Sequence, residues 1–432
     1  MSSIYHTMPL PEDVRREPPP TPSRLVSLDV FRGCVMLLLI SGGLGLMDVA
    51  RQVPDAPFLH WLAPHTEHAA WQGVRFWDFI QPSFMFIVGV AMAISSERRS
   101  ATQSYGYIFG HTLVRSFVLI LLGIFLRSNG QANTNFIFTD VLTQIGLGSI
   151  FVFLLWRQSF VTQGIVAVSV LVTYWCFFYF YQVDAHFDYT KYPLGSIQPM
   201  EGMAAHWNIH SNAAANFDRW FLNLLPHNPA NPYFYSPGGY QTLNFIPAAV
   251  TMLLGLMAGE WLLSDYSIHR QVAVLFLAGT IGIAIGYLLH ENGLCPIVNR
   301  IWTPSWTLYS AGWASIALGI FYFLFDIAHL EPAAMPIIAL GRNCILIYTL
   351  YSLLATWLVQ SMRTHFNHHL LQWLAERNAL PLQVRDAWKT KPPEDIFTLF
   401  GAYQPLAEHV FVMLVLWALA IWLYRRRFFV KI

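Results

Sequence analysis

About ten apolar runs follow one another along this chain, and each is close to the length that an α-helix needs to cross a bilayer. They lie near residues 25–49, 76–96, 107–127, 138–156, 160–182, 241–264, 270–290, 304–326, 333–360 and 407–425. Only 11% of the 432 residues are charged, whereas a soluble domain carries about 25%. The sequence therefore predicts an all-α, polytopic membrane helix bundle of about ten transmembrane helices, with membrane lipid as its surrounding partner.

The basic residues favour one orientation of this bundle. If both termini are cytoplasmic, the turn at 128–137, which has no basic residue, lies outside, and the short inner segments hold most of the arginines. These inner residues are Arg15, Arg16, Arg24, Arg98, Arg99, Arg157, Arg270, Arg425, Arg426, Arg427 and Lys431. The positive-inside rule thus predicts that both termini are cytoplasmic.

The chain divides into a short lead and one large domain. The polar, proline-rich stretch 1–24 is expected to be a disordered cytoplasmic lead, and 25–432 is expected to form the transmembrane domain. The first apolar run is too long for a signal-peptide core, so it is interpreted as the first anchor. Three longer connections, near 50–75, 183–240 and 361–406, are predicted to be extracytoplasmic, and the third is expected to contain a surface helix.

Charge and cysteine content narrow the function classes. The net charge is +1, so no nucleic-acid partner is indicated. The four cysteines, Cys34, Cys176, Cys295 and Cys344, have neither metal nor redox spacing, so neither a metal site nor a disulfide framework is expected.

Polar groups within apolar runs are costly and usually face a partner or a wet cavity. Asp29 and Arg32, in "SLDVFRG", share a helix face near the predicted inner surface. Arg342 and Asn343, in "LGRNCILIY", lie at a similar depth. These four are candidates for binding a cofactor, with a structural ion pair or snorkelling to the headgroups as the alternatives. His111, Arg115, Glu260 and Asp326 are interpreted as structural.

The predicted outer surface carries a second polar group. Glu67 and His68 end a loop that runs into a helix with Asp78, and an imidazole beside a carboxylate is typical of acid–base sites. The alternative is a solvated loop. Candidates for contacting a substrate are Trp71, Asn299, Arg300, Trp302 and Ser305, although the tryptophans also suit an aromatic belt.

Several of these segments resemble one family in order along the chain. "SLDVFRG", "HAAWQGVRFWDFIQPSFMFIVG", "PIVNRIWTPSWTLYSAG" and "GRNCILIY" are similar to motifs of the heparan-α-glucosaminide N-acetyltransferase family of transmembrane acyltransferases, and in particular of its bacterial members of unassigned substrate. The family's active histidine falls on His68, its acidic residue on Asp78, and its asparagines on Asn299 and Asn343. A heparan substrate does not follow, because the turn at 236–239 differs from the family's acidic turn.

The resemblance implies a function. It predicts an acyltransferase that moves an acetyl group from cytosolic acetyl-CoA, without a metal, to an extracytoplasmic sugar amine or hydroxyl. Separately from the resemblance, the lack of a processed N-terminal region favours a bacterial inner membrane over a lysosome, and a second copy of the chain is a candidate partner. Two other readings stay open: a transporter or exporter of a sugar or lipid-linked intermediate, and a membrane scaffold for a partner protein.

Overall fold

The computed structural model describes residues 25–184, 186–377 and 393–430. Within these ranges the chain forms α-helices and short 3₁₀ or π turns and no β-strand. The predicted disordered lead at 1–24 lies outside the described residues, as does part of the predicted outer segment 361–406.

Nine helices of the described part are long and apolar enough to cross a membrane. They are built on α1 (Val26–Ser41), α4 (Ile80–Ser100), α5 (Tyr105–Ser128), α7 (Phe160–Tyr179), α9 (Phe245–Leu262), α10 (Ile268–Glu291), α11 (Pro304–Phe321), α13 (Cys344–His365) and α16 (Gln404–Arg425). The remaining predicted span, 138–156, is the shorter apolar helix α6 (Val141–Leu155). The chain is therefore an all-helical, multi-pass membrane protein, as the apolar runs predict.

Shorter helices occupy the connections and ends. They are α2 (Leu46–Gln52), α3 (Pro57–Leu62), α8 (Ala213–Phe221), α12 (Glu331–Arg342) and α14 (His368–Glu376). The last of these lies within 361–406, where a surface helix is expected, and the extracytoplasmic location of this segment stays a prediction.

Two of the predicted spans are interrupted, so their expectation as single helices is wrong. The first, 25–49, turns at Gly42–Gly45, where the backbone is left-handed at Gly42 and Gly43. Glycine adopts this conformation readily, whereas a right-handed helix cannot continue through it. The second, 333–360, breaks between α12 and α13 at Asn343, whose φ and ψ of −119° and 26° are not helical.

Close approach of α1 and α12 depends on two glycines. A Cβ on Gly341 would lie 1.9 Å from the carbonyl oxygen of Asp29, and one on Gly33 would lie 2.0 Å from that of Ile337. Small residues of this kind let membrane helices pack backbone against backbone. The short helix α12 is thereby fixed against the N-terminal half of α1.

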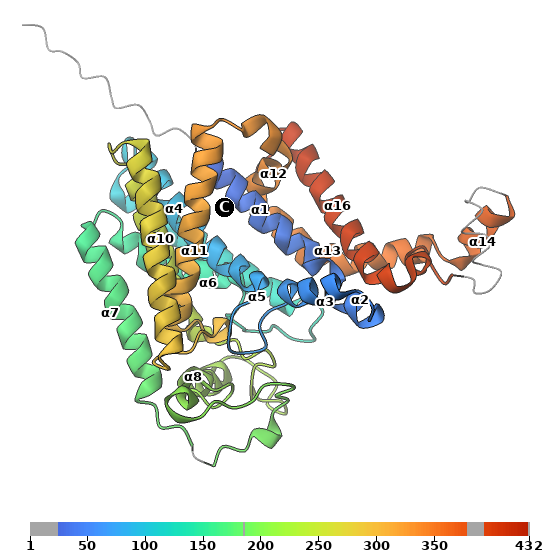
Figure 1. Ribbon diagram of the computed structural model, residues 1–432, viewed down its shortest axis with the longest axis horizontal. Coiled ribbons are helices and arrows are strands. Elements are labelled where there is room, and N and C mark those ends of the chain that lie inside the picture. Colours follow the sequence, from blue (N-terminus) through green and yellow to red (C-terminus); the bar gives the residue numbers. More distant parts are fainter. Residues whose placement is uncertain (1–24, 185, 378–392, 431–432) are drawn as a thin grey trace, which may run out of the picture.

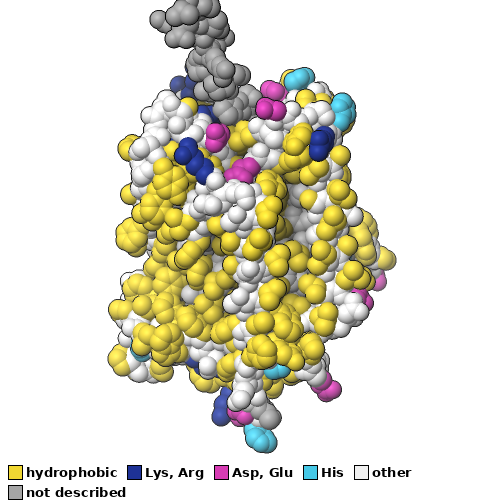
Figure 2. All heavy atoms as spheres, turned by 90° about the vertical axis from the view of Figure 1, so that its left-hand side faces the viewer, with side chains coloured by type: hydrophobic (Ala, Val, Ile, Leu, Met, Phe, Trp, Pro, Cys, Tyr) yellow, Lys and Arg dark blue, Asp and Glu magenta, His cyan; other side chains and the backbone are white. Residues whose placement is uncertain are grey.

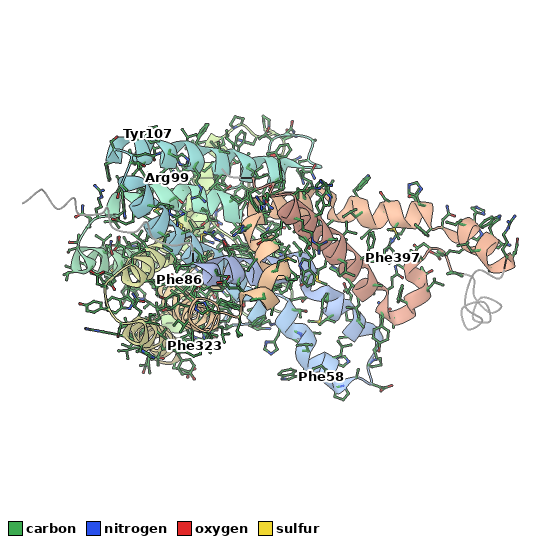
Figure 3. The ribbon with its side chains drawn as sticks, turned by 90° about the horizontal axis from the view of Figure 1, so that it is seen from above. Phe58, Phe86, Arg99, Tyr107, Phe323 and Phe397 are labelled. Atoms are coloured by element: carbon green, nitrogen blue, oxygen red, sulfur yellow. The ribbon has the colours of Figure 1, made fainter. Side chains whose placement is uncertain are left out.

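The bundle is apolar in the middle and polar at its two ends. Figure 2 shows a broad hydrophobic band, with most charged side chains on that face above and below it. In Figure 1 the start of α1 and the end of α16 lie at the upper end, and α8 with its surrounding segment lies at the lower end. From above, Phe86 of α4 lies inside the bundle, whereas Tyr107 and Phe58 lie at its edge (Figure 3). The helix α14 extends away to one side (Figure 1).

Candidate active site

His68 is held by a buried carboxylate. It lies in the loop between two 3₁₀ turns, Ala63–Thr66 and Phe76–Phe79, and Asp78 belongs to the second turn, which leads into α4. The Nδ1 atom of His68 lies 2.8 Å from Oδ1 of Asp78. The histidine side chain is 39% exposed and the aspartate side chain 0%. A carboxylate in this position favours the tautomer with hydrogen on Nδ1, which leaves Nε2 free to accept a proton.

Asp78 is itself fixed by several donors. Its Oδ2 accepts a hydrogen bond from the backbone N–H of Arg75 at 2.8 Å, and the N–H of Ala69 lies 3.4 Å from both oxygens. The side-chain amide of Asn299, from the turn Asn299–Ile301 before α11, donates to Oδ1. Donors to a carboxylate stabilise its charged form and fix its direction. Asp78 and Asn299 thus form a rigid support behind the imidazole.

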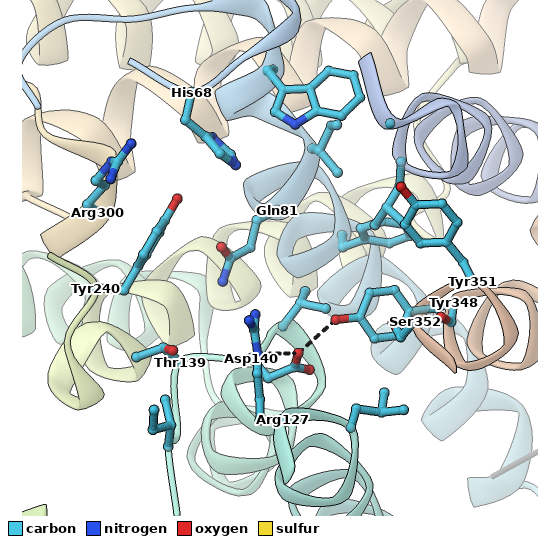
Figure 4. Close-up of a pocket in the computed structure, with 18 of the residues that line it drawn as sticks. His68, Gln81, Arg127, Thr139, Asp140, Tyr240, Arg300, Tyr348, Tyr351 and Ser352 are labelled. Atoms are coloured by element: carbon cyan, nitrogen blue, oxygen red, sulfur yellow. Dashed lines mark hydrogen bonds and ion pairs between the residues drawn. The ribbon is translucent and has the colours of Figure 1, made fainter. Parts of the chain in front are cut away.

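A large cavity of about 1040 Å³ opens beside His68. Its walls come from the end of α1, from α4, from α5 and the connection after it, from the turn before α9, and from α13. Figure 4 shows His68, Tyr240 and Arg300 on one side, Gln81 between, and Arg127, Asp140 and Tyr348 opposite. Further polar lining comes from Gln131, Asn135, Thr139, Tyr351 and Ser352. The mixture of amides, hydroxyls and aromatic rings suits an oxygen-rich ligand.

Two more predicted residues face this cavity. Glu67 and Arg300 both line it, but His68 is hydrogen-bonded to Asp78 and not to Glu67. Arg300 donates to the carbonyl of Gly238 at 2.7 Å, and its guanidinium lies 5.4 Å from the ring centre of Tyr240. Burial raises the pKa of Tyr240, so this phenol keeps its proton and presents a neutral hydroxyl to the cavity.

The other predicted substrate residues lie in the packed interior. The indole of Trp71 donates to the carbonyl of Trp207, that of Trp302 to the hydroxyl of Thr251, and the hydroxyl of Ser305 to the carbonyl of Pro296. All three side chains are buried and none is part of the cavity wall. Their contact with a substrate stays a prediction, and their visible role is to support the loops around the site.

The predicted inner residues form a separate group. Nε of Arg342 lies 3.5 Å from Oδ2 of Asp29, which joins α12 to α1. The amide of Asn343 donates to the carbonyl of Phe428 and accepts from the N–H of Val430, so it anchors the C-terminal segment. These contacts match the structural alternative, and a role in cofactor binding for Asp29, Arg342 and Asn343 stays a prediction.

Arg115 of α5, interpreted from the sequence as structural, has surroundings that suit a binding role. Two other cations, Arg32 and Arg99, lie within electrostatic range of it, and it forms no ion pair within the described part of the chain. Its Nε is buried without a hydrogen-bond partner. An uncompensated cation inside a membrane bundle is costly, so this group of arginines suits an anionic ligand. The sequence signal was an arginine near the middle of an apolar run.

Arg32 and Arg115 lie close to the cavity beside His68 along α13. Cys344, at the start of this helix, lies within electrostatic reach of Arg32 and Arg115, and Tyr348 lines the cavity. The two residues are one helical turn apart, a rise of about 6 Å. No group of three or more histidine, cysteine or acidic side chains suited to a metal occurs among the residues that the structure describes. Arg32 and Arg115 can thus hold an anion at one end of this path, and His68 with Asp78 can perform proton transfer at the other.

Two known acetyltransferases are similar to this chain. The heparan-alpha-glucosaminide N-acetyltransferase of Homo sapiens is 22% identical over 398 residues, which cover 80% of this chain and 56% of that protein. The protein of the same name from Mus musculus is 22% identical over 402 residues, covering 81% and 57%. The chain is a distant homologue of these acetyltransferases. It spans a little over half the length of either relative, and no family model matches it.

Proposed function

We propose that this protein is a transmembrane acyltransferase that moves an acetyl group from coenzyme A, bound from the cytoplasmic side, to an amine or hydroxyl of a sugar in the outer cavity. The observation that carries this proposal is the pairing of His68 with Asp78 at the wall of a large polar cavity. Distant homology to two acetyltransferases supports the reaction class. A bacterial inner membrane location remains part of the proposal.

The orientation follows from the basic residues. The last turn of α4 holds Arg98 and Arg99, and the last turn of α16 holds Arg425. The start of α1 lies at the same end of the bundle as the end of α16 (Figure 1). By the positive-inside rule this end is cytoplasmic, which puts His68 on the opposite side.

The donor would enter from that cytoplasmic end. Its phosphates are too polar for lipid and need cations, and Arg32 and Arg115 are cations without an ion pair in the described part of the chain. Arg342 would contribute only by partly releasing Asp29. The acyl-bearing arm would then run along α13, past Cys344 toward Tyr348 and the cavity.

In direct transfer, Nε2 of His68 accepts the proton of the acceptor amine or hydroxyl as that atom attacks the thioester carbonyl. The new bond to the carbonyl carbon forms, the carbon–sulfur bond breaks, and the departing thiolate takes the proton back from the imidazolium. Asp78 stabilises the imidazolium that forms in between. In the alternative route Nε2 itself attacks the carbonyl, the carbon–sulfur bond breaks, and coenzyme A departs as the thiolate. The acceptor then attacks the acetyl carbon, the carbon–nitrogen bond to His68 breaks, and the acceptor's proton passes to the freed imidazole and on to the thiolate.

The test uses purified protein with labelled acetyl-CoA. Acetyl-CoA should raise the temperature of unfolding of both the wild type and His68→Ala, because the donor site does not include the imidazole. Transfer of label to D-glucosamine should be slower by about 10²- to 10⁴-fold with His68→Ala than with the wild type. Label retained on denatured wild-type protein but not on His68→Ala would identify the two-step route. A protein that no acyl-CoA stabilises, but that exchanges a sugar across vesicles, would instead be a transporter.

A further inference from the structure

Opposite His68, the cavity is lined by three side chains that hold one another. Nε of Arg127, in the last turn of α5, lies 3.2 Å from Oδ2 of Asp140, and the hydroxyl of Tyr348 in α13 donates to the same oxygen at 2.8 Å. The dashed lines in Figure 4 trace these two contacts. The cluster of Arg127, Asp140 and Tyr348 thus joins α5, α6 and α13 at one point.

Within this cluster Asp140 fixes the side chains of Arg127 and Tyr348. Its side chain is 2% exposed, and its Oδ1 caps α6 by accepting the N–H of Leu142 at 3.0 Å. Both carboxylate oxygens therefore have partners inside the protein. A ligand in the cavity has little access to Asp140, and its effect on a ligand must pass through Arg127 or Tyr348.

Arg127 is positioned differently. Its side chain is 52% exposed, although Asp140 fixes it through Nε. In Figure 4 its guanidinium points toward Gln81, in the space between the cluster and His68. An arginine that only clamped two helices would direct its whole donor edge at protein acceptors. Here one nitrogen is used for positioning, and the remaining N–H groups face the cavity in a fixed direction.

The connection beneath Arg127 is also held in place. The N–H of Asn135 donates to the hydroxyl of Ser128 at 2.8 Å, and the amide of Gln144 donates to the carbonyl of Phe138 at 2.8 Å and of Thr242 at 3.4 Å. These bonds tie the 129–140 connection to α5 and to the start of α9. A binding group built on such a support needs little reordering when a ligand arrives.

From this geometry we infer that Arg127 is an acceptor-positioning residue, and that Asp140 and Tyr348 keep it directed at the acceptor. Resting on the proposed acyl transfer, the assignment says that the guanidinium donates to sugar oxygens on the far side of the cavity and so turns the reacting amine or hydroxyl toward Nε2 of His68. Arg127 determines which acceptors react and takes no part in proton transfer.

The experiment compares Arg127→Gln, Arg127→Lys, Asp140→Asn and Tyr348→Phe with the wild type, using D-glucosamine as acceptor and acetyl-CoA as donor. Arg127→Gln should raise the KM for glucosamine by about tenfold or more, because a hydrogen bond from a charged donor is lost, with kcat changing much less. Arg127→Lys should stay impaired, since an ammonium cannot pair with Asp140 and also present a planar fork. Asp140→Asn and Tyr348→Phe should give smaller rises in the same direction.

Binding without turnover separates this inference from the proposed reaction. Glucosamine alone should raise the unfolding temperature of the wild type and of the exposed control Arg51→Gln, but not of Arg127→Gln. Acetyl-CoA should stabilise all three alike. An unchanged glucosamine KM in Arg127→Gln, a loss of acetyl-CoA stabilisation in that variant, or a wild type that glucosamine does not stabilise would each overturn the assignment. Glucosamine binding that depends on Arg127, in a protein that transfers no acetyl group, would overturn only the proposed reaction.

Discussion

Nδ1 of His68 and Oδ1 of Asp78 lie 2.8 Å apart, with the imidazole half exposed to a cavity and the carboxylate fully enclosed. His68 lies in the loop before the 3₁₀ turn that contains Asp78, and Asn299 completes the group from a distant part of the chain. This relationship turns an otherwise solvated loop histidine into one with a defined tautomer. Substitutions at His68 and at Asp78 test this pairing.

Replacing the imidazole should remove the chemistry and leave the fold intact. His68→Ala should lower kcat for acetyl transfer by about 10²- to 10⁴-fold, the usual contribution of a general base, and by more if the histidine carries the acetyl group. The measurement is transfer of label from acetyl-CoA to glucosamine by purified protein. His60→Ala is the matched control, because His60 is exposed and lies outside the cavity lining. Near-normal turnover in His68→Ala would rule out the assignment.

Asp78→Asn should act through the tautomer of the same histidine. The amide can donate a hydrogen to Nδ1, which moves the imidazole hydrogen to Nε2 and blocks it as a base. We expect kcat to fall by about 10²- to 10⁴-fold, with little change in the KM for acetyl-CoA. Asp48→Asn, which removes an exposed ion pair with Arg51, is the control and should retain full activity. A change confined to KM would mean that Asp78 only shapes the binding site.

The spans of this protein are readable from sequence because each apolar run is long, and lipid requires a helix to satisfy its backbone. The interruption at Gly42–Gly45 had a local signal, since three of its four residues are glycine. The break at Asn343 had none. It depends on backbone geometry beside α1 and on bonds between the Asn343 amide and the C-terminal segment.

The site was only partly predictable for a different reason. His68 and Asp78 are ten residues apart, so their pairing could be proposed from one loop. Tyr348 and Asp140 are separated by 208 positions, and only the packing of α13 brings them together. The surroundings of Arg115 could not be predicted for the same reason. An arginine in an apolar run is indistinguishable from a snorkelling side chain until the helices that carry its neighbours are placed.

Substitutions at Arg115 and Arg32 should distinguish binding of the nucleotide of acetyl-CoA from binding of its acyl-bearing arm. Arg115→Gln and Arg32→Gln should raise the KM for acetyl-CoA by about 10- to 100-fold, as expected when a charged hydrogen bond to phosphate is lost. The KM for S-acetylpantetheine, which lacks the nucleotide, should not change. Arg270→Gln, whose guanidinium stacks over Tyr266, is the control. Equal losses with both donors would mean that Arg32 and Arg115 stabilise the bundle without binding phosphate.

Gly341 tests the contact between α12 and α1. Gly341→Ala should destabilise the protein by about 1–3 kcal/mol, because its Cβ would lie 1.9 Å from the carbonyl oxygen of Asp29 and the helices must move apart. Thermal unfolding in detergent measures the effect. In contrast, Gly110→Ala in α5 meets no atom within 4 Å and should stabilise slightly through helix propensity. Equal effects of the two substitutions would show that close packing at Gly341 is unimportant.

Asp218 should make the stability of the segment around α8 depend on pH. Burial in α8 raises the pKa of this carboxyl from 3.8 to about 7, although one oxygen accepts the N–H of Thr242 at 2.9 Å. The folded protein therefore binds more protons than the unfolded chain between about pH 4 and 7, and stability falls as pH rises through this window. Replacing the group by a neutral amide removes a cost of at most about 4 kcal/mol.

The measurement is the difference in unfolding temperature between Asp218→Asn and the wild type, taken from pH 4 to pH 8. This difference should become more favourable to the variant as pH rises and level off above about pH 7. Comparing the two proteins at each pH cancels the contributions of the other titratable groups to stability. One of these is His210, because burial lowers its pKa to about 4. The exposed Asp188 should show the opposite dependence of stability on pH, because a hydrogen bond from the side chain of Thr190 lowers its pKa. Asp188→Asn should lose stability relative to the wild type as pH rises from acid, and parallel profiles for the two variants would contradict burial as the cause.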